Sequence, residues 1–212
     1  MSTTHGKQET RRRLLLSALS LYAREGLHGV SLRAISAASG SRNSAAMHYH
    51  FTNKAGVIRA LLEMIYGEIS EIASQQQLAS SINDSTDLRE VLRLSLAPLV
   101  CLSRDVDWGP DALVFLARLL GEADDELAAI SNELSGEFYH RADTQLARLL
   151  PDLGVEVRQL RLIFMTVNVF HGFADLGALS HTPFGDLSTI EDEVLLGHLV
   201  DYLYNGLTGP SH

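Results

Sequence analysis

Proline is absent from this 212-residue chain until Pro98, and only five prolines occur in all. Proline inside a helix removes a backbone hydrogen bond and clashes with the preceding turn, so its absence leaves long helices free to form. Apolar residues recur at helical rather than alternating positions, as at Leu15, Leu19 and Tyr22. Because no two-residue hairpin signal and no internal repeat occurs, the sequence predicts an all-α fold.

Helix-starting and helix-ending residues divide the chain into about nine predicted helices. Ser31, Asn53 and Asp87 are favoured N-cap residues, because their side-chain oxygens accept the free backbone N–H groups of a first turn. Ser188 and Glu191 have the spacing of a capping box. The predicted helices cover residues 9–24, 31–38, 42–49, 53–77, 87 onwards, 109–121, 124–150, 155–179 and 188–206, with a polar loop at 80–86.

The composition excludes several classes of protein. With 46% hydrophobic and 20% charged residues, the chain has enough apolar surface to fold, which excludes a disordered protein. Its single cysteine, Cys101, excludes an intrachain disulfide and favours a cytoplasmic location. No apolar run approaches the ~20 residues that a membrane span needs, and the run after Arg13 is broken too soon for a signal peptide.

Charge is distributed unevenly along the chain. Residues 1–59 carry a net charge of +7 and the rest carry −16, which together give the overall −9. An acidic body repels phosphates, so the basic N-terminal end is left as the contact for a polyanion.

The motif with the clearest functional content lies between Gly26 and Lys54. Two short helices joined by a tight turn at Gly40, with Leu32, Ile35 and Ala38 on the inner face, fit a helix-turn-helix. The second helix of that motif enters the major groove of DNA. We therefore expect a DNA-binding domain at 1–52, a helical domain at 53–207 and a flexible tail at 208–212.

The second helix of the motif offers side chains that read bases. Arg42 can bond guanine and Asn43 can bond adenine, while Ser44 bonds either and Ala45 is small enough to touch a thymine methyl. Lys54 adds its charge to a helix N-terminus, so both attract a phosphate. The expected DNA contacts are Ser31, Arg42, Asn43, Ser44, Ala45, His48, Tyr49, His50 and Lys54.

Two further groups of residues in this region are interpreted differently. Phe51 is expected in the core, whereas Tyr49 and His50 are expected to face phosphate. The basic run from Arg11 to Arg13 has two open interpretations: a solvated helix face, or an approach to the DNA backbone.

A resemblance to the tetracycline-repressor (TetR) family of transcriptional regulators is carried by Ser31-Leu-Arg-Ala-Ile-Ser-Ala-Ala-Ser-Gly40, Met47-His-Tyr-His-Phe51 and Asn53-Lys54. It covers about Glu9 to Leu62, and the segment from Tyr49 to Lys54 is its most specific part. The chain departs from the family pattern by one extra residue between Gly40 and Phe51, and by His48 where tyrosine is usual. The resemblance implies a homodimer that binds operator DNA and a C-terminal domain whose small-molecule ligand weakens that binding.

The predicted helix at 155–179 is apolar nearly all round between Leu160 and Phe173. We therefore expect it to be buried on more than one side, partly by a second subunit, with Val169 inside the seam. As the resemblance implies, this eighth helix and the ninth, at 188–206, form an isologous four-helix dimer interface.

A ligand pocket in the domain at 53–207 is also implied by the resemblance. Its candidates combine aromatic walls with a few polar groups: Trp108, Phe115, Arg118, Phe138, Tyr139, Met165, Asn168 and His171. Asn168, His171 and Asp175 share one helical stripe, interpreted either as an interface hydrogen-bond network or as polar anchors for the ligand.

Together these features predict a dimeric DNA-binding regulator, a repressor that binds a palindromic operator and is released by a small-molecule effector. The alternative is a helical carrier or enzyme whose helix-turn-helix is only scaffold. Glu137-x-x-His140 has the spacing of di-iron bundles, but the second such pair, Glu25 and His28, spans a predicted helix end. No phosphate loop, zinc-type cluster or nucleophile elbow occurs, so we expect no catalytic residue, metal or cofactor and no enzyme activity.

Overall fold

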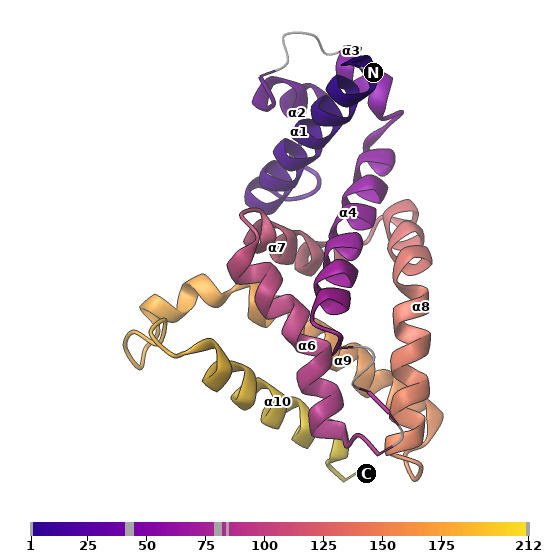
Figure 1. The fold of residues 1–212 in the computed structure, drawn as a ribbon, viewed down its shortest axis with the longest axis vertical. Helices are drawn as coiled ribbons and strands as arrows, with labels where there is room; N and C mark the ends of the chain where they lie inside the picture. The colour runs from indigo at the N-terminus through magenta and orange to yellow at the C-terminus, as the bar shows by residue number, and fades with distance from the viewer. Residues whose placement is uncertain (1, 41–44, 79–81, 84, 211–212) are drawn as a thin grey trace.

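The computed structural model describes residues 2–40, 45–78, 82–83 and 85–210. Within these ranges every element longer than an isolated bridge, which pairs Thr182 with Gly185, is a helix, and this confirms the all-α prediction there. The elements are α1 (Ser2–Glu25), α2 (Leu32–Ala38), α3 (Ala45–His50), α4 (Lys54–Gln75), α6 (Leu88–Asp105), α7 (Gly109–Leu120), α8 (Asp125–Leu149), α9 (Val155–Ala174), the 3-10 helix η1 (Leu176–His181) and α10 (Asp192–Thr208) (Figure 1). In the part of the chain described, no helix is long and apolar enough to cross a membrane.

Side-chain caps fix where four of these helices begin, and three of them, at Ser31, Asn53 and Asp87, were predicted from the sequence. In each case a side-chain oxygen of the N-cap residue accepts a backbone N–H from the first turn. The pairs are Ser31 with Ala34, Asn53 with Gly56, Asp87 with Glu90 and Asp124 with Leu127. The predicted proline-containing start of α7 at Gly109 is also confirmed.

The first helix is longer than predicted. α1 begins at Ser2 rather than Glu9, because its first residues are polar and give no apolar periodicity to detect. It ends as predicted at Gly26, whose φ of +82° is a left-handed conformation that glycine adopts freely. The extension places Lys7 on the helix, one turn before Arg11.

The predicted helix at 155–179 is shorter, and the predicted capping box is wrong. α9 ends at Ala174, and the chain continues as η1. Ser188 does not cap α10, because its backbone N–H and hydroxyl both donate to the Asp186 carboxylate instead. Glu191 occupies the N-cap position, and α10 continues past Gly206, the predicted end, to Thr208.

Three predicted segments fall partly outside the described residues. Of the predicted helix at 42–49, the structure describes the part from Ala45 onwards. Residues 80, 81 and 84 of the predicted loop and residues 211 and 212 of the predicted tail also lie outside.

One continuous hydrophobic core joins the N-terminal helices to the rest of the molecule. α1, α2 and α3 form one end, and the long α4 runs from them beside α8 (Figure 1). α7 lies against both α1 and α9. At the first of these contacts the buried rings of Tyr22 and Phe115 stack with their centroids 6.1 Å apart.

Candidate DNA-binding interface and effector domain

Helix α3 has a buried side and an exposed side. Met47 and Phe51 belong to the core, which confirms the expectation for Phe51. Tyr49 on the opposite side is 67% exposed, and His50 is half-buried beside it. The end of α3 therefore presents one aromatic ring and one imidazole to the outside.

Two basic side chains of α1 lie over this end of α3. Lys7 Nζ donates a hydrogen bond to Tyr49 Oη at 2.9 Å, and the Arg11 guanidinium lies 5.4 Å from the centre of the Phe51 ring. Burial, and then the charges of Arg11 and Lys7, lower the pKa of His50 below its ordinary value. The imidazole is therefore neutral at pH 7 and flanked by two cations.

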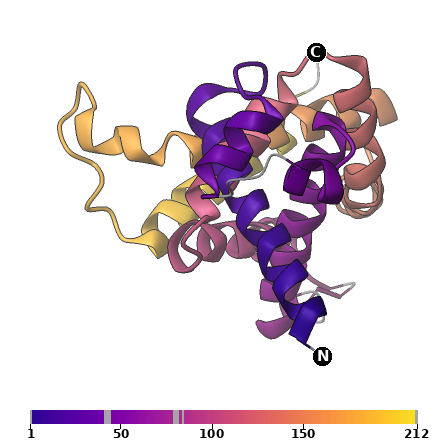
Figure 2. The same ribbon diagram turned by 90° about the horizontal axis from the view of Figure 1, so that it is seen from above.

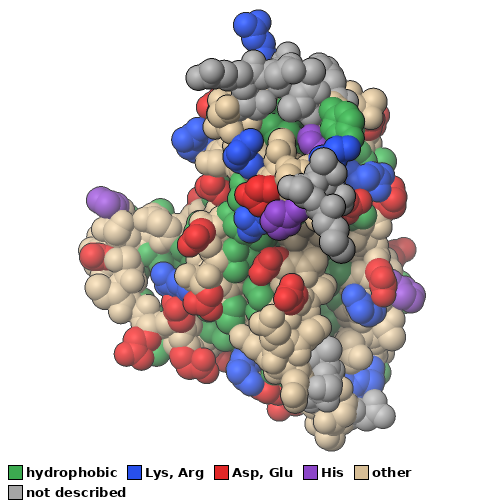
Figure 3. Space-filling view, turned by 45° about the horizontal axis from the view of Figure 1, so that its top comes forward, with side chains coloured by type: hydrophobic (Ala, Val, Ile, Leu, Met, Phe, Trp, Pro, Cys, Tyr) green, Lys and Arg blue, Asp and Glu red, His purple; other side chains and the backbone are tan. Residues whose placement is uncertain are grey.

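Lys54 adds a third positive charge at the first position of α4. Asn53 caps that helix, and the free N–H groups of its first turn add a partial positive charge. Figure 3 shows Lys and Arg side chains around the upper end of the molecule, with Asp and Glu side chains spread over the body below. The uneven charge of the sequence thus becomes a basic end on an acidic body.

Of the predicted DNA contacts, Tyr49 and His50 lie at the end of α3 and Lys54 at the start of α4, and all three stay candidates. Ser31 is occupied as the N-cap of α2. The other predicted contacts lie outside the described residues, entirely or in their side chains: Arg42, Asn43, Ser44, Ala45 and His48.

Sequence reasoning did not single out Lys7, and it left the basic run from Arg11 to Arg13 with two open interpretations. Of that run, Arg11 lies over α3, whereas Arg12 and Arg13 line a groove of about 430 Å³ along α1 that ends at Arg24 and Ala38. The available signal was the spacing of four between Lys7 and Arg11, which puts both on one face once the helix is extended to Ser2.

The eight predicted ligand residues lie on α7, α8 and α9 or next to them, and they range from buried to exposed. Phe115 is buried against Tyr22 at the α1–α7 contact, and Arg118 of the same helix is exposed. Phe138 is exposed on α8, with its ring edge-to-face on Tyr139 at 5.7 Å. Trp108, Tyr139 and Met165 are half-buried and contact the core. These residues stay candidates for a ligand site.

The last two candidates lie on the outer side of α9. His171 is exposed there, and the Asn168 amide donates to the Phe164 carbonyl at 2.7 Å. Tyr202 of α10 donates its hydroxyl to Asn168 Oδ1 at 3.4 Å. Asn168 therefore links the outer faces of α9 and α10.

The outer face of α9 is apolar, but Val169 is not part of it. Exposed apolar side chains follow one side of the helix: Leu160, Ile163, Phe164 and Val167. Val169 is buried in the core of its own subunit, so the expectation that it lies in an intersubunit seam is wrong. Because the helix is apolar nearly all round, the sequence could not tell the inner side from the outer.

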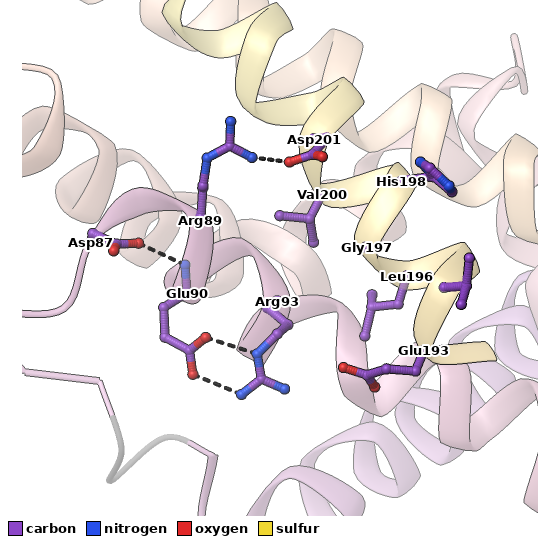
Figure 4. Close-up of a pocket in the computed structure, with 11 residues that line it drawn as sticks. Asp87, Arg89, Glu90, Arg93, Glu193, Leu196, Gly197, His198, Val200 and Asp201 are labelled. Atoms are coloured by element: carbon purple, nitrogen blue, oxygen red, sulfur yellow. Dashed lines mark hydrogen bonds and ion pairs between the residues drawn. The ribbon is translucent and has the colours of Figure 1, made fainter. Parts of the chain in front are cut away.

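A surface groove of about 430 Å³ lies between α6 and α10, and none of the eight candidates lines it (Figure 4). Leu196 and Val200 form its apolar floor. Arg89 pairs with Asp201 across it and also lies 3.9 Å from the Tyr204 ring. Within α6, Arg93 binds Glu90 bidentately and lowers the pKa of that carboxyl.

Two family models match the chain. The model described as bacterial regulatory proteins, tetR family, covers residues 14–61, which include α2, α3 and the start of α4. The model described as tetracyclin repressor-like, C-terminal domain, covers residues 93–206, more than half of the chain. The chain belongs to the TetR family. It is a DNA-binding transcriptional regulator of that family.

Solved structures share this TetR fold at low sequence identity. NalD, the secondary repressor of the MexAB-OprM multidrug efflux pump in Pseudomonas aeruginosa, is 20% identical with a TM-score of 0.66, over 98% of this chain and 100% of NalD. The fatty acid degradation regulator FadR from Bacillus halodurans is 15% identical with a TM-score of 0.63, over 96% and 97%. A transcriptional regulator from Rhodococcus sp. Rha1 is 17% identical with a TM-score of 0.61, over 93% and 95%. No curated protein sequence matches the chain.

The DNA-binding end of this TetR-family regulator is joined to its body by polar contacts as well as the Tyr22–Phe115 stack. His28, just after α1, bonds Glu122 at the end of α7, with 3.0 Å between Nε2 and Oε1. Burial of Glu122 opposes its ionisation, but the backbone N–H of Asp124 and the His28 ring hold the pKa of Glu122 below its usual range. This contact therefore links the helix-turn-helix to the C-terminal domain.

One residue of each di-iron-like pair interacts with another side chain in this regulator. Glu137 lies 3.7 Å from Arg141, and His28 bonds Glu122 rather than approaching His140. Across the described ranges, no group of three or more His, Cys, Asp or Glu side chains could hold a metal ion.

Proposed function

We propose that this protein is a repressor that binds a near-palindromic operator as a homodimer and leaves it when a small molecule binds the C-terminal domain. The observation that carries the proposal is the basic cluster of Lys7, Arg11 and Lys54 around the exposed end of α3. These groups lie where helix-turn-helix proteins place phosphate contacts, beside the helix that enters the major groove.

The proposed dimer interface is the outer face of α9 and α10. The apolar side chains on the outside of α9 continue onto α10 through Val194 and Tyr202. A contiguous apolar face of this kind marks a protein interface. When the same face of a second copy covers it, the apolar faces of both subunits are removed from water, as in an interface with two-fold symmetry.

Effector release is proposed to act through the α1–α7 contact. The Tyr22–Phe115 stack and the His28–Glu122 bond connect the DNA-binding end to α7. An effector that displaces α7 therefore shifts one helix-turn-helix relative to the other. Its effect is limited to the difference between its affinities for the two conformations, typically 1–3 kcal/mol.

Selection of bound sequences from a random DNA pool tests the proposal. We expect a near-palindrome whose half-sites are ~34–36 Å apart, because two recognition helices must fit successive major grooves. A carrier or enzyme with a scaffold helix-turn-helix gives no enriched sequence and no retarded DNA even at low salt. That result would contradict the proposal that the protein is a DNA-binding repressor.

Variants at the DNA-binding end separate the roles proposed there. Lys54→Ala and His50→Ala should weaken binding about equally on all sequences, because phosphate contacts carry no base information. Arg42→Ala or Asn43→Ala should relax base preference, at a cost of roughly 1–3 kcal/mol per lost bidentate contact. Arg141→Ala, an exposed arginine on α8, is the matched control and should change neither property. Full base preference after Arg42→Ala would show that the recognition face is misassigned.

A further inference from the structure

An arm of the chain stands away from the rest of the molecule. It comprises residues 175–191, between α9 and α10, and includes η1. Seen from above, it extends to the side, clear of the other helices (Figure 2). η1 has no buried residue. Only the base of the arm, through Leu176, contacts the hydrophobic core.

Local hydrogen bonds give the arm its shape. Thr182 and Gly185 exchange backbone hydrogen bonds of 3.3 and 3.0 Å, and Thr182 Oγ1 donates to the Gly185 carbonyl at 2.7 Å. Gly185 has φ of +100°, which a residue with a side chain rarely adopts. Farther back, Leu187 N–H donates to the Leu179 carbonyl at 2.7 Å. The tip is therefore ordered without packing against the body.

Phe184 is displayed at this tip. It is 89% exposed, more than any other large apolar side chain in the described part of the chain. Leaving a phenylalanine in water forgoes the stabilisation that its burial gives. A preordered loop that presents an aromatic ring loses little further entropy on binding, and phenylalanine is among the residues enriched at the buried centre of interfaces.

We propose that Phe184 and its arm clasp a second copy of this chain. The arm connects α9 to α10, so it borders the apolar face that the proposed dimer covers, and the inference rests on that dimer. The arm contains Asp175, Asp186 and Glu191 but no Lys or Arg. This negative charge opposes contact with DNA or an anionic membrane. The charge therefore disfavours both polyanions, and the position of the arm beside the proposed dimer face favours a second subunit as the occupant.

Photo-crosslinking from the tip tests the partner directly. A benzophenone amino acid replaces Phe184 in a tagged copy, which is mixed with an untagged full-length copy and irradiated with and without selected operator DNA. We expect a tagged–untagged crosslink in both samples. Crosslinks confined to the tagged chain, or formed with DNA, overturn the proposal.

The strength of the dimer gives a second measurement. By sedimentation, Phe184→Ala should raise the dissociation constant of the dimer at least about tenfold, the effect of losing an interface anchor. Leu120→Ala, an exposed leucine on α7, is the matched control and should change it less than about threefold.

The outcomes distinguish the arm from the proposed function. If wild type dimerises and Phe184→Ala dimerises equally well, the arm proposal is overturned and the repressor dimer stands. If wild type is monomeric at micromolar concentration with and without operator, both are overturned. Because Phe184 is exposed, its replacement should leave the thermal unfolding of the isolated subunit unchanged.

Discussion

Tyr22 is the residue on which the contact between α1 and α7 centres. Its ring is fully buried against Phe115, and no described residue is within hydrogen-bond distance of its hydroxyl. A buried hydroxyl without a partner costs about 1–3 kcal/mol. Burial also raises the pKa of Tyr22 to about 12, because the phenolate is poorly solvated there.

Tyr22→Phe should therefore stabilise the protein, and more so in alkali. At pH 7 we expect the free energy of unfolding to rise by about 1 kcal/mol. In the unfolded chain the phenol ionises near pH 10, so the native state loses stability between pH 10 and pH 12 as the unfolded state releases its proton first. Over this pH range the free energy of unfolding should fall by roughly 2–3 kcal/mol more in wild type than in Tyr22→Phe. Urea unfolding at pH 8, 10, 11 and 12 measures this difference. Equal decreases in the two proteins would contradict the prediction.

Gly109 is required by a close approach between the end of α6 and the start of α7. A Cβ there would lie 1.6 Å from the Leu102 carbonyl oxygen and 2.6 Å from its carbon, both backbone atoms that no rotamer change can move. Gly109→Ala should lower the free energy of unfolding by about 3 kcal/mol or more, the upper end for overpacking. Urea unfolding measures the loss.

Gly136→Ala is the control for that prediction. Gly136 lies inside α8, where an added Cβ meets nothing within 4 Å. The substitution should stabilise the protein by roughly 0.5–1 kcal/mol, because alanine is the better helix former. Equal effects of the two substitutions would show that the close approach at Gly109 does not constrain the fold.

At the scale of helices, the starts marked by Ser31, Asn53 and Asp87 caps were predictable from the sequence, whereas the start of α1 and the outward side of α9 were not. Asn53 and Asp87 cap their helices through bonds to residues three positions away, which the sequence shows directly. Ser188 failed as a cap because Asp186, two positions earlier, offered a competing acceptor. The ligand candidates were chosen by helix, but the side of a helix that faces inward depends on how the helices cross, which no local signal records.

The two sides of α9 can be separated by one pair of variants. Phe164→Asp places a charge on the outer face and should dissociate the dimer while circular dichroism keeps its helical signal. Val169→Asp buries a charge in the core of the subunit and should prevent stable folding, because an unpaired buried carboxylate costs several kcal/mol. Sedimentation and circular dichroism measure the two effects. A folded monomer from Val169→Asp, with Phe164→Asp still dimeric, would reverse the assignment of the faces.

At the scale of the whole molecule, the fold collects one sign of charge at the DNA-binding end. The sequence predicted this separation between residues 1–59 and the rest, because charge along a chain can be counted without a structure. It did not predict that Lys7 and Arg11 lie over the end of α3, since this depends on α1 crossing α3. The proposed function therefore assigns three described cations per subunit, Lys7, Arg11 and Lys54, to operator phosphates.

These cations set the expected salt dependence of operator binding. Each neutralised phosphate releases counterions and contributes a slope of about −0.9 to the logarithm of affinity against the logarithm of salt concentration. Three contacts from each of two subunits give a slope of about −5, and Lys54→Ala should reduce its size by about 2, because the dimer loses two contacts. Phe164→Asp should leave a monomer with about half the wild-type slope.

Titrations of selected operator at four salt concentrations measure all three slopes. An unchanged slope for Lys54→Ala would remove that residue from the interface, and a full slope for a monomeric Phe164→Asp would contradict the two-subunit contact.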